Sequence, residues 1–447
     1  MSDDTRAQLD RRYYLKLAGT AGALGLAGCA GNGGQGETTT TTTQEQGDGT
    51  TTTQEPSFNT LEIVHWWTAG GEKQALQALI DGFTSKYPEI SIENNPAPGG
   101  AGSALDTVIK SRVLNENPPS TFQIWPGKSL HPYVEAGILK DIGDSVWSQK
   151  MRDAYQPGVM NMARPQGNLV AVPLNIHRLN NLFYNVSVVE SAGVDPTTIQ
   201  SPGDLLSALR TIGEQTDAAP MAQQTKSVWS TVQLWEDVLL GQSGVDTYTS
   251  ILDGNVAENE SAVKDALTTV KKYSNYFNKD SGSISWDQAN AKVINGDAAV
   301  IHQGDWAAGQ YKAREGFTFG EDWDYVPFPG TDSVYHVVTD SFVFPQPNPS
   351  PEATERWLQY CGSVEGQKKF NPIKGSIPPR TDVPKDPFGP FLREQMDDFA
   401  ASSAQPPTIA HGTGVVPEVK SSIEGALSSF ISNWDVNQAY QGIKNAF

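Results

Sequence analysis

Aromatic and polar side chains end several short apolar runs, where a ring-shaped molecule could be held against flat side chains. Trp66 and Trp67 close the run that begins at Leu61, and Trp125 closes the run that begins at Thr121. Open α/β sheets bind ligands at the carboxyl ends of their strands, so these indole rings are candidates for stacking. Either ring of the first pair could equally belong to an apolar core, because aromatic residues at strand ends commonly bury area.

The elements that carry these rings alternate between strand and helix. Residues 61–67 have strand length, and the apolar residues between Leu76 and Phe83 recur at helical spacing. Further strands are predicted over 121–125, 169–173, 182–185, 298–302, 325–328 and 341–344. A helix is predicted over 102–114, and Ser201 followed by Pro202 predicts a capped helix start. The region 188–314 is predicted to be mainly helical, and the alternation as a whole indicates an α/β fold.

Composition limits the classes of partner. The 447 residues include 51 acidic and 32 basic side chains, a formal net charge of −19. This balance argues against a nucleic-acid partner. The acidic residues are dispersed, which is typical of a surface adapted to high salt. The length predicts two domains with substantial cores.

The first 29 residues are predicted to be an export signal. Arg11 and Arg12 resemble a twin-arginine motif, and a short run of small apolar residues follows them. That run is too short to span a bilayer permanently. It ends in Leu-Ala-Gly-Cys, which is similar to a lipobox, so Cys29 is the expected lipidation site. The protein would then be held at the extracellular face of the cell membrane by its lipid.

A polar segment over 30–57 follows Cys29 and is rich in Gly, Thr and Gln. It cannot bury a core, so we expect a tether between the membrane and the folded body. Two Asn-x-Ser sequons, at Asn185 and Asn259, are expected at the surface as glycosylation candidates. The second cysteine, Cys361, has no partner for a disulfide and is expected to be a small buried apolar residue.

Several short motifs follow one another in a fixed order along the chain. They are the lipobox, the tether, LEIVHWW, KYPEI, NIHR, GDWAAG, TDSF and NPIKGSIPPR. Together they resemble an extracellular solute-binding protein of an ABC sugar importer, and more narrowly its glucose- and mannose-binding branch. The resemblance covers roughly residues 60–447. It implies a two-lobed periplasmic-binding-protein-like α/β fold with a hinge and a cleft between the lobes.

The resemblance also implies which residues enclose a sugar ring. The matching positions are Trp67, Gln123, Trp286, Trp306, Asp340, Lys374 and His411, with Glu72 as a further contact. Relatives of this branch often carry a histidine two residues after the glutamine, where this chain has Trp125, so a hydrogen-bonding group is exchanged for a stacking face. A pyranose offers C–H faces to indole rings and hydroxyls to donors and acceptors, which suits this set. Each residue taken alone could be an ordinary core or surface residue.

The expected division of the chain follows from the same resemblance. Residues 58–174 and 327–378 would form the first lobe, and residues 175–326 and 379–447 the second. The sugar would bind in the open form and the lobes would close over it by hinge motion. The closed, monomeric protein would deliver the sugar to membrane permease subunits, with no cofactor and no metal. The other five histidines lack metal-ligand spacing and are expected to be structural.

Two alternatives remain open. A binding protein for a disaccharide or a longer sugar would use the same motifs, although a monosaccharide, glucose above all, is the preferred interpretation. A secreted glycoside hydrolase would need two carboxylates across the scissile bond, and Glu72 with Asp340 could form such a pair. The motif order and the anchored export design favour capture without catalysis.

Overall fold

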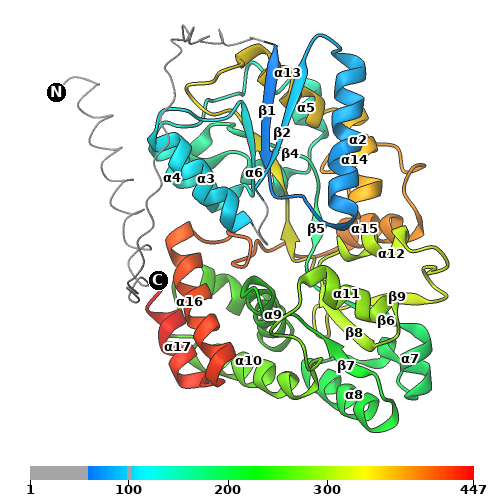
Figure 1. Cartoon of the computed structure of the whole chain (residues 1–447). Helices are drawn as coiled ribbons and strands as arrows, with labels where there is room; N and C mark the ends of the chain where they lie inside the picture. Colours follow the sequence, from blue (N-terminus) through cyan, green and yellow to red (C-terminus); the bar gives the residue numbers. More distant parts are fainter. Residues whose placement is uncertain (1–58, 98–101) are drawn as a thin grey trace, which may run out of the picture.

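The computed structural model describes residues 59–97 and 102–447, and these form two lobes, each with its own sheet and surrounding helices (Figure 1). The predicted signal over 1–29 with Cys29, and the tether over 30–57, lie outside the described residues. Each lobe has its own apolar core. The predicted two-lobed α/β architecture is therefore confirmed.

The first lobe contains a five-stranded mixed sheet. Its strands, in spatial order, are β2 (Ser91–Pro96), β1 (Thr60–His65), β3 (Thr121–Ile124), β11 (Ser341–Val343) and β4 (Ala171–Pro173). β1 is parallel to both β2 and β3, whereas β11 is antiparallel to β3 and β4. Because β11 lies far downstream of the other four strands, this sheet is assembled from separate parts of the chain.

Helices cover this sheet and supply much of the first core. They are α2 (Gly70–Lys86), α3 (Ser103–Leu114), α4 (His131–Glu135), α5 (Gln149–Ala154), α6 (Pro157–Met162), α13 (Pro351–Cys361) and α14 (Val364–Lys374). α2 buries Leu76, Leu79 and Phe83 on one face, which matches its predicted helical spacing. α14 packs along α2 and ends at Gly375, whose φ of +80° glycine adopts without strain. Both helices thereby reach the cleft with charged end residues.

The second lobe contains a four-stranded sheet in the order β7 (Ala219–Ala222), β8 (Ala298–Gln303), β6 (Asn181–Asn185) and β9 (Trp323–Pro327). β8 is parallel to β7 and antiparallel to β6. The flanking helices are α7 (Val186–Ser191), α8 (Pro202–Gln215), α9 (Trp229–Leu252), α10 (Glu260–Tyr273), α11 (Trp286–Ile294), α12 (Ala307–Ala313), α15 (Pro390–Ala401), α16 (Pro417–Asn433) and α17 (Val436–Lys444). α8 begins as predicted, with Ser201 accepting a hydrogen bond from Asp204 N at 3.2 Å.

Short segments join the two lobes. The two-residue strands β5 (His177–Arg178) and β10 (Val337–Val338) pair antiparallel between the sheets, and Ile176 bridges to Ile377 beside them. Four short 3-10 helices complete the described secondary structure, namely η2 (Gly127–Leu130), η3 (Pro165–Gly167), η4 (Pro196–Thr198) and η5 (Ser274–Tyr276). These connections are the expected position of the hinge between the lobes.

A close backbone contact lies beside these connections, where α12 approaches α2 and α14. A Cβ atom at Gly309 would lie 3.1 Å from the carbonyl oxygens of Ile373 and Lys374. A Cβ atom at Gly71 would lie 2.9 Å from the same Ile373 oxygen. The lobes therefore meet here through glycines, because a larger residue would hold the helices apart.

Several predicted boundaries shift by one or two residues. The strand predicted to end at Trp67 ends at His65, and the strand predicted to end at Trp125 ends at Ile124, so these tryptophans follow their strands. The strand predicted over 169–173 begins at Ala171. Pairing with neighbouring strands stops where the chain turns toward the cleft, and the apolar run continues beyond that point.

The surface placement of one sequon was wrong. Asn185 is only 6% exposed, caps α7 by accepting from Val188 N at 3.1 Å, and donates to Val293 O at 2.9 Å. Its amide nitrogen is therefore occupied in the folded protein. Asn259 is half-buried, and Cys361 is buried as predicted. In the described part of the chain, no helix has both the length and the apolar character needed to cross a membrane.

Candidate functional site

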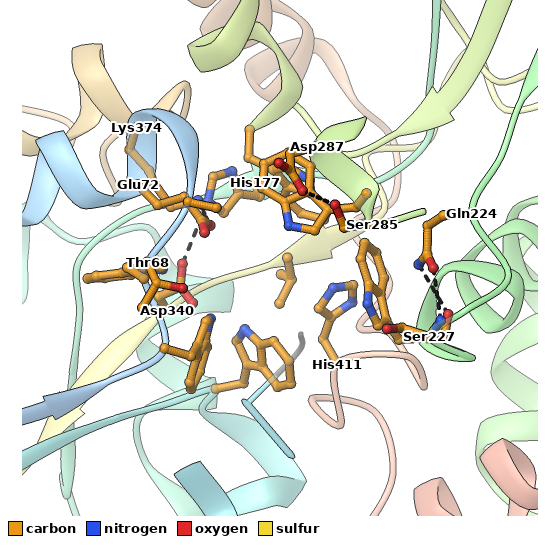
Figure 2. Close-up of a pocket in the computed structure, with 18 of the residues that line it drawn as sticks. Thr68, Glu72, His177, Gln224, Ser227, Ser285, Asp287, Asp340, Lys374 and His411 are labelled. Carbon is orange, nitrogen blue, oxygen red and sulfur yellow. Dashed lines mark hydrogen bonds and ion pairs between the residues drawn. The ribbon is translucent and has the colours of Figure 1, made fainter. Parts of the chain in front are cut away.

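A pocket of about 300 Å³ lies between the two lobes. Its walls come from both sheets' ends and from loops that are far apart in sequence. The lining residues are Trp66, Trp67, Thr68, Ala69, Glu72, Trp125, His177, Gln224, Lys226, Ser227, Trp229, Ser285, Trp286, Asp287, Trp306, Val338, Asp340, Lys374 and His411. Figure 2 shows Glu72, Lys374 and Asp340 on one side, Gln224 and Ser227 on the other, and His411 between them.

Nearly all the residues predicted from sequence meet in this pocket. The predicted residues that line it are Trp67, Glu72, Trp125, Trp286, Trp306, Asp340, Lys374 and His411. Gln123 is the exception, since it is fully buried and absent from the lining. The pocket therefore unites residues whose positions in the sequence span more than two thirds of the chain.

Gln123 lies one layer behind the pocket and orients Asp340. Its side-chain nitrogen donates to Asp340 Oδ1 at 3.1 Å, and its side-chain oxygen accepts from Trp66 N at 3.1 Å. Gln123 thus stands behind the residues that line the pocket, and its contact with a ligand stays a prediction. In the sheet Gln123 is paired with Phe342 of β11, two residues after Asp340.

Asp340 is an ionised acceptor at the hinge. Asn175 Nδ2 donates to Asp340 Oδ2 at 2.7 Å, while Asp340 N donates to Asn175 Oδ1 at 2.7 Å. Burial alone would raise the pKa of Asp340, but the hydrogen bond from His177 and the positive charge of Lys374 outweigh burial and lower the pKa to about 2. Asp340 is thus a carboxylate at every physiological pH and can accept hydrogen bonds from hydroxyl groups.

Glu72 and Lys374 form an ion pair beside the aromatic wall. Lys374 Nζ lies 3.0 Å from Glu72 Oε1, and the two residues come from the facing ends of α2 and α14. The ammonium group also lies 5.8 Å from the centroid of the Trp306 ring. Burial raises the pKa of Glu72 even though Lys374 acts in the opposite direction. This pair offers a donor and an acceptor to a polar ligand without leaving an isolated buried charge.

Aromatic rings from both lobes surround His411. The Trp125 ring from the first lobe lies 4.8 Å from His411, and the Trp306 and Trp229 rings from the second lobe lie 5.7 Å and 5.9 Å from it. Burial lowers the pKa of His411 to about 3, so its imidazole is neutral. Its Nδ1 atom is buried and makes no hydrogen bond with any residue that the structure describes. A neutral imidazole can donate or accept, which suits a ligand hydroxyl.

The two adjacent tryptophans differ in their surroundings. Trp67 is 1% exposed and packs in the first core, with ring centroids 4.9 Å from Phe370 and 5.9 Å from Phe342. Trp66 is half-buried and lies 4.8 Å from Trp125. The predicted stacking ring, Trp67, therefore borders the pocket from within the core, while Trp66 presents more surface to it.

His177 was assigned a structural role from sequence, and the structure places it in the lining. Its Nδ1 atom is hydrogen-bonded to Asp305, and its Nε2 atom lies 3.6 Å from Asp340 Oδ2. Burial and Lys374 lower its pKa, but Asp305 and Asp340 have the larger combined effect and raise the pKa above its ordinary value. The NIHR motif was the available signal for this residue, since it lies at the hinge.

Several other lining residues were not predicted from the sequence. Trp229 begins α9, and Gln224, Lys226 and Ser227 form the loop before it. Asp287 follows the predicted Trp286 at the start of α11. Their approach to the pocket depends on how α9 and α11 pack, and spacing along the chain does not report this. Within the described residues, no group of His, Cys, Asp and Glu side chains could hold a metal ion.

Comparison with known proteins agrees with this geometry. Residues 69–368 match the bacterial extracellular solute-binding protein family. The chain is 38% identical over 436 residues to the xylose/arabinose-binding protein XacG of Haloferax volcanii, covering 95% of this chain and 94% of that protein. It is 37% identical over 439 residues to an uncharacterised ABC transporter extracellular-binding protein of Pyrococcus horikoshii, covering 98% and 96% of the two chains.

Solved structures share the same architecture. The bacterial solute receptor AcbH matches with a TM-score of 0.75 at 18% identity, covering 87% of this chain and 97% of that chain. At this identity the likeness concerns the fold, and that fold agrees with the two lobes and the pocket between them. Family and fold point the same way, and the chain belongs to the bacterial extracellular solute-binding proteins.

Proposed function

We propose that this protein is the substrate-binding subunit of an ABC importer and that it captures one pyranose monosaccharide between its lobes. The observation that carries the proposal is the pocket itself, which combines indole rings from both lobes with an ionised carboxylate, an ion pair and a neutral imidazole. Indole faces pack on the C–H faces of a sugar ring, and the polar groups match its hydroxyls. The name of XacG as a sugar-binding protein supports the same class of ligand.

The pocket volume supports a monosaccharide over a longer sugar. About 300 Å³ is at the small end of the range for small-molecule sites. The contact of 4.8 Å between Trp125 and His411 also joins the two lobes across the pocket, which limits extension of a ligand in that direction. A disaccharide would have to displace this contact.

Glucose and xylose are the leading candidate ligands. The motif pattern resembles glucose binders, whereas XacG is named for xylose and arabinose. Glucose and xylose share equatorial hydroxyls at ring carbons 2, 3 and 4 and differ by the hydroxymethyl group at carbon 5. We propose glucose as the preferred ligand, with Trp125 and Trp66 forming the wall that would contact that hydroxymethyl group.

Closure follows from the division of contacts between the lobes. Glu72, Trp66 and Asp340 come from the first sheet and its helices, while Trp306 and His411 come from the second lobe. A sugar that touches both sets is bound more tightly by the closed form, and this difference in affinity shifts the population toward closure. The closed complex would then dock on membrane permease subunits and release the sugar there.

Capture without catalysis is the better interpretation of the two carboxylates. Glu72 is paired with Lys374 at 3.0 Å, and Asp340 is held by Asn175 and Gln123 with a pKa of about 2. With so low a pKa, Asp340 could act only as the base or the nucleophile, so Glu72 would have to supply the proton, and its ion pair with Lys374 opposes that role. We therefore propose that the protein is not an enzyme.

The N-terminal residues support an anchored location. The lipobox with Cys29, the twin-arginine motif and the polar segment over 30–57 together suggest a monomer held outside the cell by a lipid on a tether. Mass spectrometry of the protein from its membrane would test this directly. A mature N-terminus at Cys29 with an added diacylglycerol is expected, and an unmodified N-terminus upstream of Cys29 would refute it.

The sugar assignment is tested by titrating the purified protein with D-glucose, D-mannose, D-galactose, D-xylose, L-arabinose and maltose. We expect saturable binding of one molecule of a monosaccharide, measured by tryptophan fluorescence and by calorimetry. Stoichiometric binding of maltose alone would replace the proposal with a disaccharide binder. Release of reducing ends with turnover would replace it with a hydrolase.

A variant pair links that binding to the pocket. Trp306→Ala removes a ring that faces His411, so we expect the affinity to fall roughly tenfold or more. Trp434→Ala is the control, because Trp434 packs against Phe430 away from the lining residues. Equal affinities for both variants and the parent would show that the sugar binds elsewhere.

A further inference from the structure

A fully buried carboxylate on α9 organises the loop that carries His411. Glu236 Oε1 accepts a hydrogen bond from Ile409 N at 2.5 Å, and Oε2 accepts from Ala410 N at 2.9 Å. Thr408 Oγ1 donates to the same Oε2 atom at 2.9 Å, and the Tyr248 hydroxyl donates to Oε1. One side chain thus receives hydrogen bonds from three consecutive residues of a loop that has no regular secondary structure.

The same loop is closed on itself. Thr408 N donates to Thr413 Oγ1 at 2.9 Å, and Gly412 N donates to Ile409 O at 2.9 Å. Gly412 has a φ of +70°, which glycine adopts without strain. Residues 408–413 form this loop, and it is referred to as the 408–413 loop. Its internal bonds set its shape, and Glu236 fixes that shape to α9.

The outer face of the 408–413 loop touches both the pocket and the opposite lobe. His411 lines the pocket, as described above. Ser129 Oγ, from η2 of the first lobe, donates to Gly412 O at 2.7 Å, and Lys128 N donates to Thr413 O at 3.1 Å. A shift of this loop would therefore move a ligand-facing imidazole and break hydrogen bonds between the lobes at the same time.

The neighbouring acid on α9 makes its own hydrogen bonds to other elements, although its partner His336 also lies 3.9 Å from Glu236 Oε1 and 3.3 Å from the Tyr248 hydroxyl. Asp237 Oδ2 lies 2.6 Å from His302 Nε2 on β8, and Asp237 Oδ1 lies 2.7 Å from His336 Nδ1, next to the hinge strand β10. Both of these hydrogen bonds of Asp237 go to histidines outside the 408–413 loop. It is buried to the same degree as Glu236, so it provides a matched comparison on the same helix.

We propose that Glu236 is a positioning residue, which sets the 408–413 loop so that His411 meets the ligand and Gly412 and Thr413 meet the first lobe. The affinity part of this inference rests on the proposed sugar-binding function. The positioning part concerns the protein without ligand. Glu236 acts through the loop and has no place in the pocket lining.

The test is amide hydrogen exchange on the ligand-free protein, comparing the parent with Glu236→Gln and Asp237→Asn. Glu236→Gln replaces a carboxylate, whose two oxygens both accept hydrogen bonds, with an amide whose NH2 group must face N–H or O–H donors of the loop. We expect Ile409 and Ala410 to exchange roughly 10- to 100-fold faster in this variant. In Asp237→Asn these two amides should stay within about threefold of the parent, because their acceptor is intact.

A milder variant covers the case in which Glu236→Gln does not fold. Thr408→Val removes one donor to the carboxylate and keeps the shape of the side chain, so we expect a smaller acceleration confined to residues 408–413. Unchanged exchange at Ile409 and Ala410 in folded Glu236→Gln would overturn the proposal. Faster exchange to the same extent throughout the second lobe would also overturn it, since that is a loss of general stability.

A second arm uses D-glucose and D-xylose as probes. Whichever of the two sugars the parent binds, Glu236→Gln should bind it at least tenfold more weakly, while Glu258→Gln, a change at an exposed glutamate, should match the parent. Full affinity in a Glu236→Gln variant with accelerated exchange would overturn the link to the ligand. If the parent binds neither sugar, the sugar proposal fails, and the exchange experiment still decides the positioning role.

Discussion

Asp340→Asn is the most informative single change in the pocket, because the stabilisation that it removes can be worked out from the structure. The carboxyl pKa falls from an ordinary value of 3.8 to about 2 on folding. Since one pKa unit corresponds to ~1.4 kcal/mol, the ionised form stabilises the folded state by about 2 kcal/mol at neutral pH. The substitution would also turn an amide group toward the donors of Asn175 and Gln123.

The sign of the pH dependence follows from the lowered pKa. The contribution of Asp340 is complete above the unfolded pKa near 3.8 and is lost as pH falls through about 2. Urea unfolding at pH 7 should therefore give a free energy of unfolding about 2 kcal/mol lower for Asp340→Asn than for the parent. At pH 3 the difference should shrink to about 1 kcal/mol.

The control is Asp332→Asn, which makes the same chemical change at an exposed position of the same segment. Its free energy of unfolding should stay within about 0.5 kcal/mol of the parent. If the two variants lose equally little at pH 7, or if the loss at Asp340 does not depend on pH, then the carboxylate is not held in the way described here. Sugar affinity should fall together with stability in Asp340→Asn, because the same oxygens are the proposed hydroxyl acceptors.

Three further changes test other parts of the molecule. Gly309→Ala should lower the free energy of unfolding in urea by roughly 1–3 kcal/mol, because the added Cβ would press on α14. Gly425→Ala, in open space on α16, should raise that free energy by roughly 0.5–1 kcal/mol, and equal effects of the two changes would refute the close contact. The raised pKa of His177 contributes stability that is present below pH 6.5 and is lost as pH rises through the pKa of the folded state. His177→Gln should therefore flatten the decline of the free energy of unfolding above pH 6.5, and an unchanged slope would count against the pairing of His177 with Asp305. Trp66→Ala should weaken sugar binding roughly tenfold in titrations, while Trp67→Ala should mainly destabilise the fold, by roughly 3–5 kcal/mol in urea unfolding. If Trp67→Ala weakens binding more than Trp66→Ala does, Trp67 is the stacking ring.

Local patterns in the sequence predicted much of the fold. The apolar spacing of α2 and the Ser-Pro start of α8 depend on contacts within a few residues, so their signals lie in short stretches. The ends of β1 and β3 were placed too far along the chain. Strand ends are decided by the neighbouring strand, and apolar residues such as Trp67 and Trp125 continue past the last pairing.

The candidate site shows the same difference between residues with a local signal in the sequence and residues whose position depends on packing. Motif matches brought Asp340, Lys374 and His411 to the pocket, because those positions follow strand and helix ends in the order of elements that this fold requires. Gln123 and Trp67 were assigned to the ligand, but packing against the hinge and the first core decides where they point. Trp229 was missed, since only the path of α9 through the second lobe brings its first residue to the cleft.

The pocket draws its walls from Trp66 near the start of the folded body and from His411 near its end. During synthesis the last wall leaves the ribosome only after almost every other residue has emerged. A shortened product that stops before α16 lacks the packing that supports residue 411, and a product that begins after Trp67 lacks the two tryptophans of the opposite wall. The pocket is therefore complete only in a chain that extends from Trp66 through the helices that support residue 411.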